Sequence, residues 1–370
     1  MVYKIFRLLL FRMNPEFVHR WTVKLGRIFS RSVLACGVVK QMYGAEWNSL
    51  GVKAFGLNFN NPIGLAAGFD KQGELSGIIS SIGFGHMEVG SISLMPWPGN
   101  PSPTLLRLPD DRGLINRLGL NSDGARVVEM RLKKKCTHIP IGINLVKTPD
   151  PNIFGEKAIE DYLESVSRFY SFGDYITLNL SCPNTVDGKC FEDIELLNPF
   201  LSHLRQLRST LETATGYKAF LVKLSPDLDD SNLERLVDIS LQYGIDGFVI
   251  GNTTSRRTGL KTAQDKLDKF GPGGLSGYPL KKYIEQMIDK VFTQTSGQVP
   301  IVACGGVGCD PNQDPAREVW EYLKRGATLV QMYTGLVYQG PSLVRRINKG
   351  LASILHAEGI SNLNDFLNAR

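Results

Sequence analysis

Short apolar runs alternate with amphipathic stretches along most of the chain. After residue 60, eight runs rich in β-branched or other apolar residues each end in a turn that contains Gly, Asn or Ser. The segments between them, such as 158–170, 232–244 and 317–326, repeat apolar residues every three or four positions, which is typical of helices with one buried face. The eight predicted strands are 62–68, 86–92, 140–145, 175–181, 219–225, 247–254, 300–306 and 329–335.

The order of these elements predicts an α/β fold. Eight strand–helix units fit a single (β/α)8 TIM barrel better than two doubly wound sheets, and an open sheet remains the alternative. In such a barrel the chemistry lies at the C-terminal ends of the strands, and phosphate commonly binds after strands seven and eight. Glycines follow both of these predicted strands, in CGGVG at 304–308 and YTG at 333–335. They favour a phosphate-bearing ligand, because glycine lets backbone N–H groups approach a phosphate, although ordinary tight turns also use glycine.

The remaining strand ends are unusually polar. A structural cap would explain any one of these side chains, but a barrel would collect them around one mouth. Neutral amides together with two lysines suit a flavin with an anionic substrate stacked against it. The residues at these strand ends are Lys71, Ser91, Asn144, Asn179, Lys223, Asn252 and Thr253.

The N-terminal segment has a different character from the rest of the chain. Residues 1–40 hold eight Lys and Arg against one acid, Glu16, and therefore carry about +7, whereas the whole chain sums to +6. Asn14 and Pro15 form a helix-start signal between two apolar, basic stretches, neither of which is long enough to span a bilayer. We expect 1–40 to be a helical element lying in the membrane interface, ahead of a barrel domain at 41–370. A helical cap buried on the barrel is the alternative.

Composition excludes several other functions. The main body has no basic stripe of the kind that binds nucleic acid, so no nucleic-acid partner is expected. Six cysteines without a CxxC pair indicate a reducing compartment. Five scattered histidines lack metal-ligand spacing, so no metal is predicted.

Seven segments carry a resemblance that runs in order over nearly the whole chain. They are GLAAGFDKQGE (64–74), GLINRLGLNSDG (113–124), NLSCPNT (179–185), KLSPDL (223–228), GNTTSR (251–256), GGLSGYPL (273–280) and LVQMYTGLVYQGP (329–341). These segments resemble the quinone-linked class (class 2) of the dihydroorotate dehydrogenase family. The resemblance implies an FMN-containing barrel that oxidises dihydroorotate to orotate in pyrimidine (UMP) biosynthesis and passes the electrons to ubiquinone. It also implies attachment to a membrane surface: the mitochondrial inner membrane in a eukaryote, the cytoplasmic membrane in a bacterium.

The resemblance also assigns site residues. It implies FMN contacts from Ala66, Ala67, Gly68, Ser91, Asn144, Asn179, Lys223, Gly251, Ser276, Gly277, Gly305, Gly306, Tyr333 and Thr334. It implies substrate contacts from Lys71, Asn116, Asn179, Asn184, Asn252 and Thr253. It places His19, Arg107 and Tyr333 along a quinone tunnel that the N-terminal helices would open to the membrane.

The thiol in NLSCPNT stands where the resemblance places the catalytic base. Cys182 would remove a proton from the carbon next to a ring carbonyl while hydride leaves the neighbouring carbon for the flavin. A thiol with a pKa of ~8.5 gives a usable thiolate fraction near neutral pH. The quinone-linked class usually has serine here and the soluble class has cysteine, but the soluble class lacks the N-terminal extension. The alternative functions are a soluble-type enzyme that uses fumarate or a partner subunit, and a non-catalytic membrane-binding barrel that retains FMN.

Overall fold

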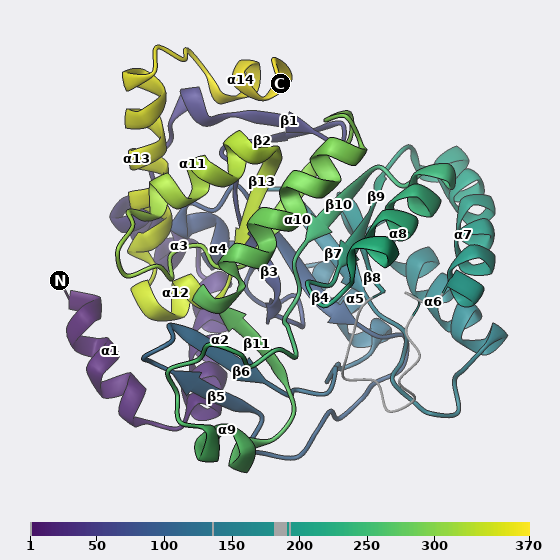
Figure 1. Ribbon diagram of the computed structural model, residues 1–370, viewed down its shortest axis with the longest axis horizontal. Coiled ribbons are helices and arrows are strands. Elements are labelled where there is room, and N and C mark those ends of the chain that lie inside the picture. The colour runs from purple at the N-terminus through teal and green to yellow at the C-terminus, as the bar shows by residue number, and fades with distance from the viewer. Residues whose placement is uncertain (1, 135–136, 181–190, 192–193) are drawn as a thin grey trace.

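A computed structural model describes residues 2–134, 137–180, 191 and 194–370 (Figure 1). Eight parallel strands close into a barrel in the order β10-β12-β13-β3-β4-β7-β8-β9, so the predicted TIM barrel is confirmed and the open sheet is wrong. Each predicted strand overlaps one barrel strand. The strands are β3 Ile63–Asp70, β4 His86–Ile92, β7 Ile141–Leu145, β8 Tyr175–Asn179, β9 Ala219–Leu224, β10 Gly247–Ile250, β12 Ile301–Cys304 and β13 Ala327–Met332.

Helices surround the barrel (Figure 1). In α6 the apolar residues Ile159, Tyr162, Val166 and Phe169 recur at helical spacing and are all buried, which is why the periodic pattern at 158–170 marked this element. The flanking helices are α4 Ser76–Ile82, α5 Ala125–Leu132, α6 Glu156–Phe169, α7 Ile194–Thr215, α8 Asp230–Gln242, α10 Lys281–Gln294, α11 Pro315–Arg325, α12 Thr334–Gln339, α13 Ser342–Ala357 and α14 Leu363–Asn368.

Two small sheets lie outside the barrel. The hairpin of β1 (Val52–Ala54) and β2 (Leu57–Phe59) packs at the N-terminal ends of the barrel strands, where Phe59 contacts His86 at the start of β4. An antiparallel sheet of β5 (Leu105–Leu108), β6 (Gly113–Asn116) and β11 (Gly274–Gly277) joins two distant parts of the chain. With α9 (Gln264–Phe270) this sheet forms a small apolar core of its own. These elements were not predicted from the sequence.

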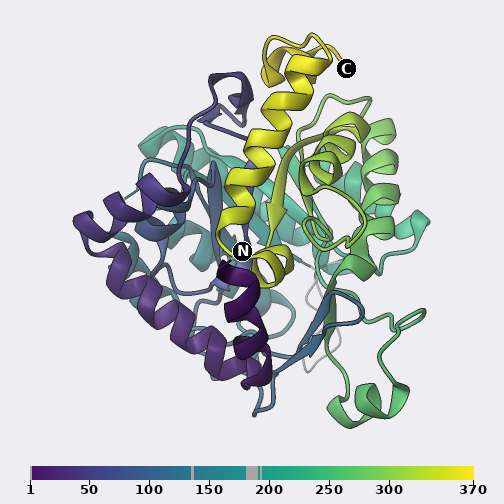
Figure 2. The same cartoon turned by 90° about the vertical axis from the view of Figure 1, so that its left-hand side faces the viewer.

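The N-terminal segment forms three helices along one side of the molecule, α1 Val2–Arg12, α2 Pro15–Ser30 and α3 Val33–Tyr43 (Figure 2). The predicted helix start is confirmed, because the Asn14 side chain accepts hydrogen bonds from two backbone N–H groups of α2, at 2.9 and 3.1 Å. The expected domain boundary after residue 40 falls inside α3. Helix α2 rests on α4, since Ser30 Oγ accepts from the Ile78 backbone N–H at 3.1 Å and Arg27 lies 3.1 Å from Glu74.

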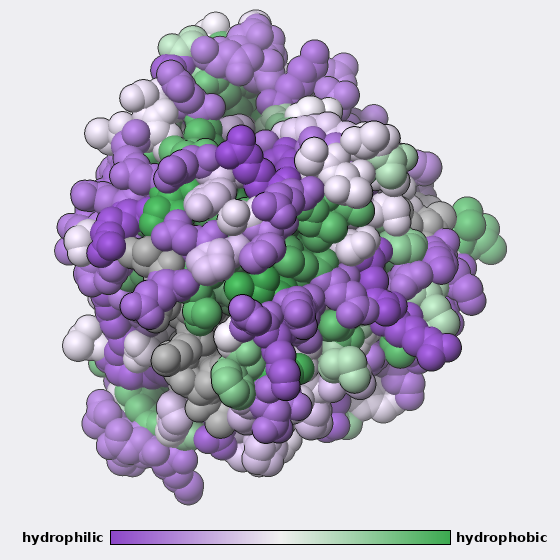
Figure 3. All heavy atoms as spheres, turned by 90° about the vertical axis from the view of Figure 1, so that its right-hand side faces the viewer, coloured by the Kyte–Doolittle hydropathy of each residue, from purple (hydrophilic) through white to green (hydrophobic). Residues whose placement is uncertain are grey.

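Helices α2 and α3 expose large apolar side chains to solvent. Neither helix has a buried residue, and most of the exposed large apolar side chains of the described chain come from the first 42 residues. The opposite side of the molecule, around α6, α7 and α8, is mainly hydrophilic with separate apolar patches (Figure 3). No helix within the described ranges combines the length and apolar character needed to cross a bilayer. The exposed large apolar residues within this N-terminal segment are Ile5, Phe6, Leu8, Leu9, Met13, Phe17, Trp21, Leu25, Ile28, Phe29, Val33, Leu34, Val38 and Met42.

Candidate active site

The C-terminal mouth of the barrel contains a cavity built from strand ends and from β11. Its wall combines glycine backbone, the hydroxyl side chains of serine, threonine and tyrosine, and the buried Lys223 of β9. Such a site offers both backbone donors and a cation to an anionic ligand. The lining residues are Ala66, Ala67, Lys223, Asn252, Thr253, Ser276, Gly277, Leu280, Cys304, Gly305, Gly306, Val307, Met332, Tyr333, Thr334 and Gly335.

The loop after β12 provides the part of this cavity best suited to a phosphate. Gly305 and Gly306 have φ values of 133° and 79°, a region that favours glycine, and a Cβ on Gly306 would lie 3.0 Å from the Lys281 backbone. The Ser276 and Thr334 hydroxyls, which line the same cavity, are 2.9 Å apart. Close backbone and small hydroxyls leave this end of the site polar and narrow, so the residues present fit the phosphate of a flavin mononucleotide.

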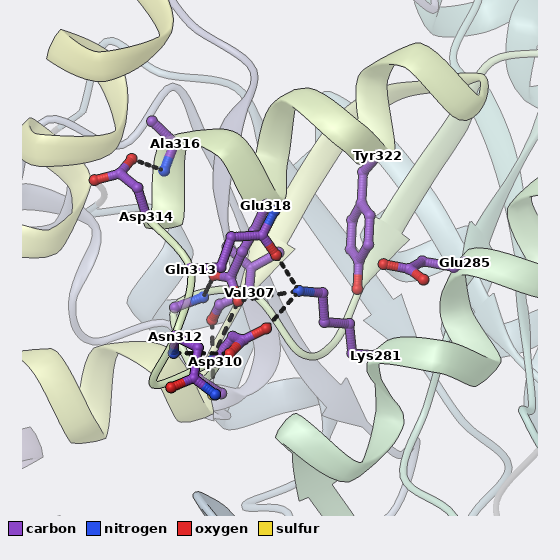
Figure 4. A network of polar contacts seen from close by, with 12 residues as sticks. Lys281, Glu285, Val307, Asp310, Asn312, Gln313, Asp314, Ala316, Glu318 and Tyr322 are labelled. Carbon is purple, nitrogen blue, oxygen red and sulfur yellow. Dashed lines mark hydrogen bonds and ion pairs between the residues drawn. The ribbon is translucent and has the colours of Figure 1, made fainter.

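A buried carboxylate on α11 holds the same loop through hydrogen bonds to its backbone (Figure 4). Glu318 of α11 is 1% exposed and accepts the backbone N–H groups of Gly308 at 2.6 Å and Asp310 at 3.1 Å. Lys281 Nζ lies 2.8 Å from Asp310 and 3.7 Å from Glu318. Burial raises the pKa of Glu318 from 4.5 to about 7, although the Gly308 N–H and the Lys281 charge act in the opposite direction. The loop conformation therefore depends on a carboxyl group that titrates near neutral pH.

A second group of strand-end side chains forms a hydrogen-bonded row beside the cavity. Ser91 of β4 donates to Asn144 of β7 at 2.5 Å, and Asn179 of β8 donates to Ser91 at 2.9 Å. Asn252, which follows β10, donates to Asn179 at 3.3 Å. The structure thus brings together four predicted residues from four different strand ends, as the barrel register requires.

Three further predicted site residues have partners outside this row. Lys71 donates to Asn121 at 2.8 Å, and Asn116 of β6 donates to the Gly274 carbonyl at 3.3 Å. Gly251 has a φ of 109°, and a Cβ there would lie 2.0 Å from the Cys304 carbonyl oxygen, so a residue with a side chain would displace the loop. Cys182 and Asn184 lie outside the described residues.

An aromatic group connects the cavity to α2. The His19 ring lies 5.7 Å from the Phe69 ring and 6.4 Å from the Tyr333 ring, measured between centroids, and Tyr333 also lines the cavity. Gly68, which precedes Phe69, is packed close to the Tyr333 ring. Burial and the Lys71 charge lower the pKa of His19 to about 4, so its imidazole is neutral at pH 7.

Arg107, the third predicted tunnel residue, has a different environment. Its guanidinium donates to the carbonyls of Leu10 at 3.0 Å and Met13 at 2.8 Å, and it lies 4.8 Å from the Phe11 ring centroid. It therefore fixes the end of α1 against β5.

A larger cavity of about 1120 Å³ lies elsewhere, between α3, the β1–β2 hairpin and α14. It is at the N-terminal ends of the barrel strands. In a TIM barrel that face contributes to stability, whereas catalytic groups lie at the opposite face. The smaller cavity at the mouth is therefore the candidate active site.

Sequence reasoning missed the acidic residues that organise the site. Glu88 lies inside the apolar run HMEVGSI, and its carboxylate accepts the Asn144 amide at 3.1 Å. Glu318 lies on a helix whose pattern predicted only packing. A charged residue within an otherwise apolar strand was the one available signal, but its partners come from other strands and are visible only in the fold.

Comparison with known proteins agrees with this geometry. A sequence model of the family described as dihydroorotate dehydrogenase matches residues 49–355. The dihydroorotate dehydrogenase (quinone) of Gloeobacter violaceus is 39% identical over 363 residues, covering 98% of this chain and 97% of the relative. That of Mycobacterium sp. strain KMS is 35% identical with the same coverage. A crystal structure of ligand-free DHODH from Eimeria tenella superposes with a TM-score of 0.83 at 32% identity, covering 96% of this chain and all of that one. The chain therefore belongs to the quinone-linked class of the dihydroorotate dehydrogenase family, whose members are flavin-dependent oxidoreductases.

Proposed function

We propose that this protein binds FMN in the barrel mouth, oxidises dihydroorotate to orotate, and passes the electrons to ubiquinone at a membrane surface. The observation that carries the proposal is the cavity lined by Lys223, the Gly305–Gly306 backbone and the Ser276 and Thr334 hydroxyls. The glycine and hydroxyl end would hold the phosphate, and Lys223 would lie beside the ring system. FMN bound there would supply the hydride acceptor.

The row of amides next to the cavity would hold the substrate. Asn179 and Asn252 would offer hydrogen bonds to the ring of dihydroorotate, together with Asn116, Asn184 and Thr253. Lys71 would provide positive charge for its carboxylate. Cys182 would take the proton from the ring carbon.

The N-terminal helices would provide the route for the electron acceptor. Exposed apolar side chains and basic residues on α1, α2 and α3 are the combination that binds an anionic bilayer surface. The contact of His19 with Tyr333 joins these helices to the cavity wall. This arrangement supports a quinone acceptor over fumarate or a partner subunit, with residues 1–40 as the membrane element of a catalytic domain at 41–370.

Anaerobic mixing tests the proposal directly. The purified protein should be yellow, and dihydroorotate should bleach the bound flavin in the absence of oxygen. A short-chain ubiquinone should then restore the flavin absorbance, whereas fumarate should not. A flavin that stays oxidised in dihydroorotate would refute the proposed reaction, and reoxidation by fumarate alone would favour the soluble-type alternative.

A further inference from the structure

A continuous chain of hydrogen bonds runs from the barrel interior to the mouth. Glu88 on β4 is fully buried and accepts from Asn144 at 3.1 Å. Asn144 accepts from Ser91 at 2.5 Å, and Ser91 accepts from Asn179 at 2.9 Å. Asn179 accepts from Asn252 at 3.3 Å. One carboxylate is thus linked in series to four side chains of the proposed flavin and substrate site.

The chemistry of Glu88 determines which partner donates in each hydrogen bond of this chain. Three donors converge on the carboxylate: the Asn144 amide, the Thr177 hydroxyl at 3.0 Å and the Gln331 amide at 2.8 Å. An acceptor at this position requires Asn144 to turn its NH2 inward and its oxygen toward Ser91. Ser91 must then donate to Asn144, and its oxygen is left to accept from elsewhere.

The far end of the chain imposes the same direction independently. The backbone N–H of Thr253, which can only donate, bonds the Asn252 side-chain oxygen at 2.9 Å. Asn252 therefore presents its NH2 to Asn179, whose oxygen accepts it and whose own NH2 points to Ser91. The two ends agree, so each amide in the row has one favoured orientation.

We infer that Glu88 is a positioning residue, which sets the orientation of the Asn144, Ser91 and Asn179 side chains and thereby the pattern of donors and acceptors presented to the ring of the bound substrate or product. The inference rests on the proposed function, because orotate and dihydroorotate are the ligands that would hydrogen-bond to these donors and acceptors. A site that hydrogen-bonds a ligand discriminates strongly against a wrong donor or acceptor, since a buried polar group then remains unpaired.

The neighbours of Glu88 provide a matched pair of substitutions. Among the described residues Gln331 Oε1 is a buried atom without a hydrogen-bond partner, so this amide can turn and offer its oxygen to a new NH2 group. Glu88→Gln can therefore keep an oxygen for Asn144 while its NH2 meets Gln331. Glu88→Met fills a similar volume without any acceptor, which frees Asn144 to turn over. Thr177→Val removes a donor to Glu88 but leaves the chain intact, and serves as the control.

The test is the dissociation constant of orotate, measured from the change in flavin absorbance on protein saturated with added FMN. Glu88→Met should weaken orotate binding roughly 5- to 150-fold, the range for an unsatisfied buried polar group, while Glu88→Gln and Thr177→Val should stay near wild type. The melting temperature is measured in parallel. If Glu88 only supports the core, Glu88→Met will melt earlier but bind orotate as tightly as wild type, and the inference is overturned. Wild-type protein that binds no orotate would instead refute the proposed function.

Discussion

The carboxyl group of Glu318 should make the stability of the barrel depend on pH in a defined way. In the folded chain burial raises its pKa from 4.5 to about 7, so folding favours the protonated form. The resulting stabilisation is fully present below pH 4.5. It declines between pH 4.5 and about pH 7, where Glu318 is ionised in the unfolded chain but still protonated in the folded chain, and it is gone above about pH 7. At about 1.4 kcal/mol per pKa unit, this difference in pKa between the folded and the unfolded chain changes the free energy of unfolding by roughly 3 kcal/mol.

The variant Glu318→Gln isolates this contribution, because glutamine has a similar shape but does not titrate. An unfolding entropy of roughly 2.1 cal/mol/K per residue gives ~0.8 kcal/mol/K for a chain of 370 residues, so ~3 kcal/mol corresponds to ~4 °C. The melting temperature of the wild type minus that of the variant should therefore fall by ~4 °C between pH 4.5 and pH 8. Scanning fluorimetry at one fixed, saturating FMN concentration measures both proteins.

The neighbouring Glu321 provides the control. It lies on the same helix, its side chain is 42% exposed, and it forms a surface ion pair with Lys324. Exposed pairs contribute about 0–1 kcal/mol, so Glu321→Gln should show little change across the same pH range. A difference between wild type and Glu318→Gln that stays constant, or that grows with pH, would refute the role assigned to burial.

Three further predictions concern the proposed reaction. Deleting residues 1–40 should release the protein from anionic liposomes and abolish ubiquinone reduction while dihydroorotate still bleaches the flavin; full-rate reduction of long-chain ubiquinone by the truncated protein would contradict this. Lys223→Ala should raise the FMN dissociation constant, measured by flavin fluorescence, because the substitution removes a buried cation from the cavity wall; unchanged FMN affinity and turnover would show that Lys223 does not contribute to the FMN site. Cys182→Ala should slow flavin reduction by roughly 10²–10⁴-fold in stopped-flow mixing with FMN still bound, and a rate equal to wild type would remove Cys182 from the chemistry.

The sequence allowed the barrel to be predicted because its signals are local. Each barrel strand is an apolar run beside a periodic helix, and the Asn14 cap depends on residues only two and three positions away. The β5–β6–β11 sheet gave no such signal, since its strands lie outside the repeating strand–helix units and Ser276 pairs with Leu114 across 162 positions of sequence. Glycines and polar strand ends indicated most of the cavity wall. The roles of Glu88 and Glu318 depend on partners that only the closed barrel brings together.

The way α1 is attached has a consequence for the order in which the chain can assemble. Tyr3 donates to the Val337 carbonyl at 2.6 Å and Arg7 donates to the Tyr338 carbonyl at 2.8 Å, so the first helix is anchored on one of the last. These contacts span more than 330 residues. During synthesis α1 cannot form these contacts until α12 has left the ribosome. We therefore expect α1 to dock after the rest of the barrel has folded. Stalled chains that end before residue 330 should remain cleavable by protease within residues 2–12, and the released full-length protein should be protected there.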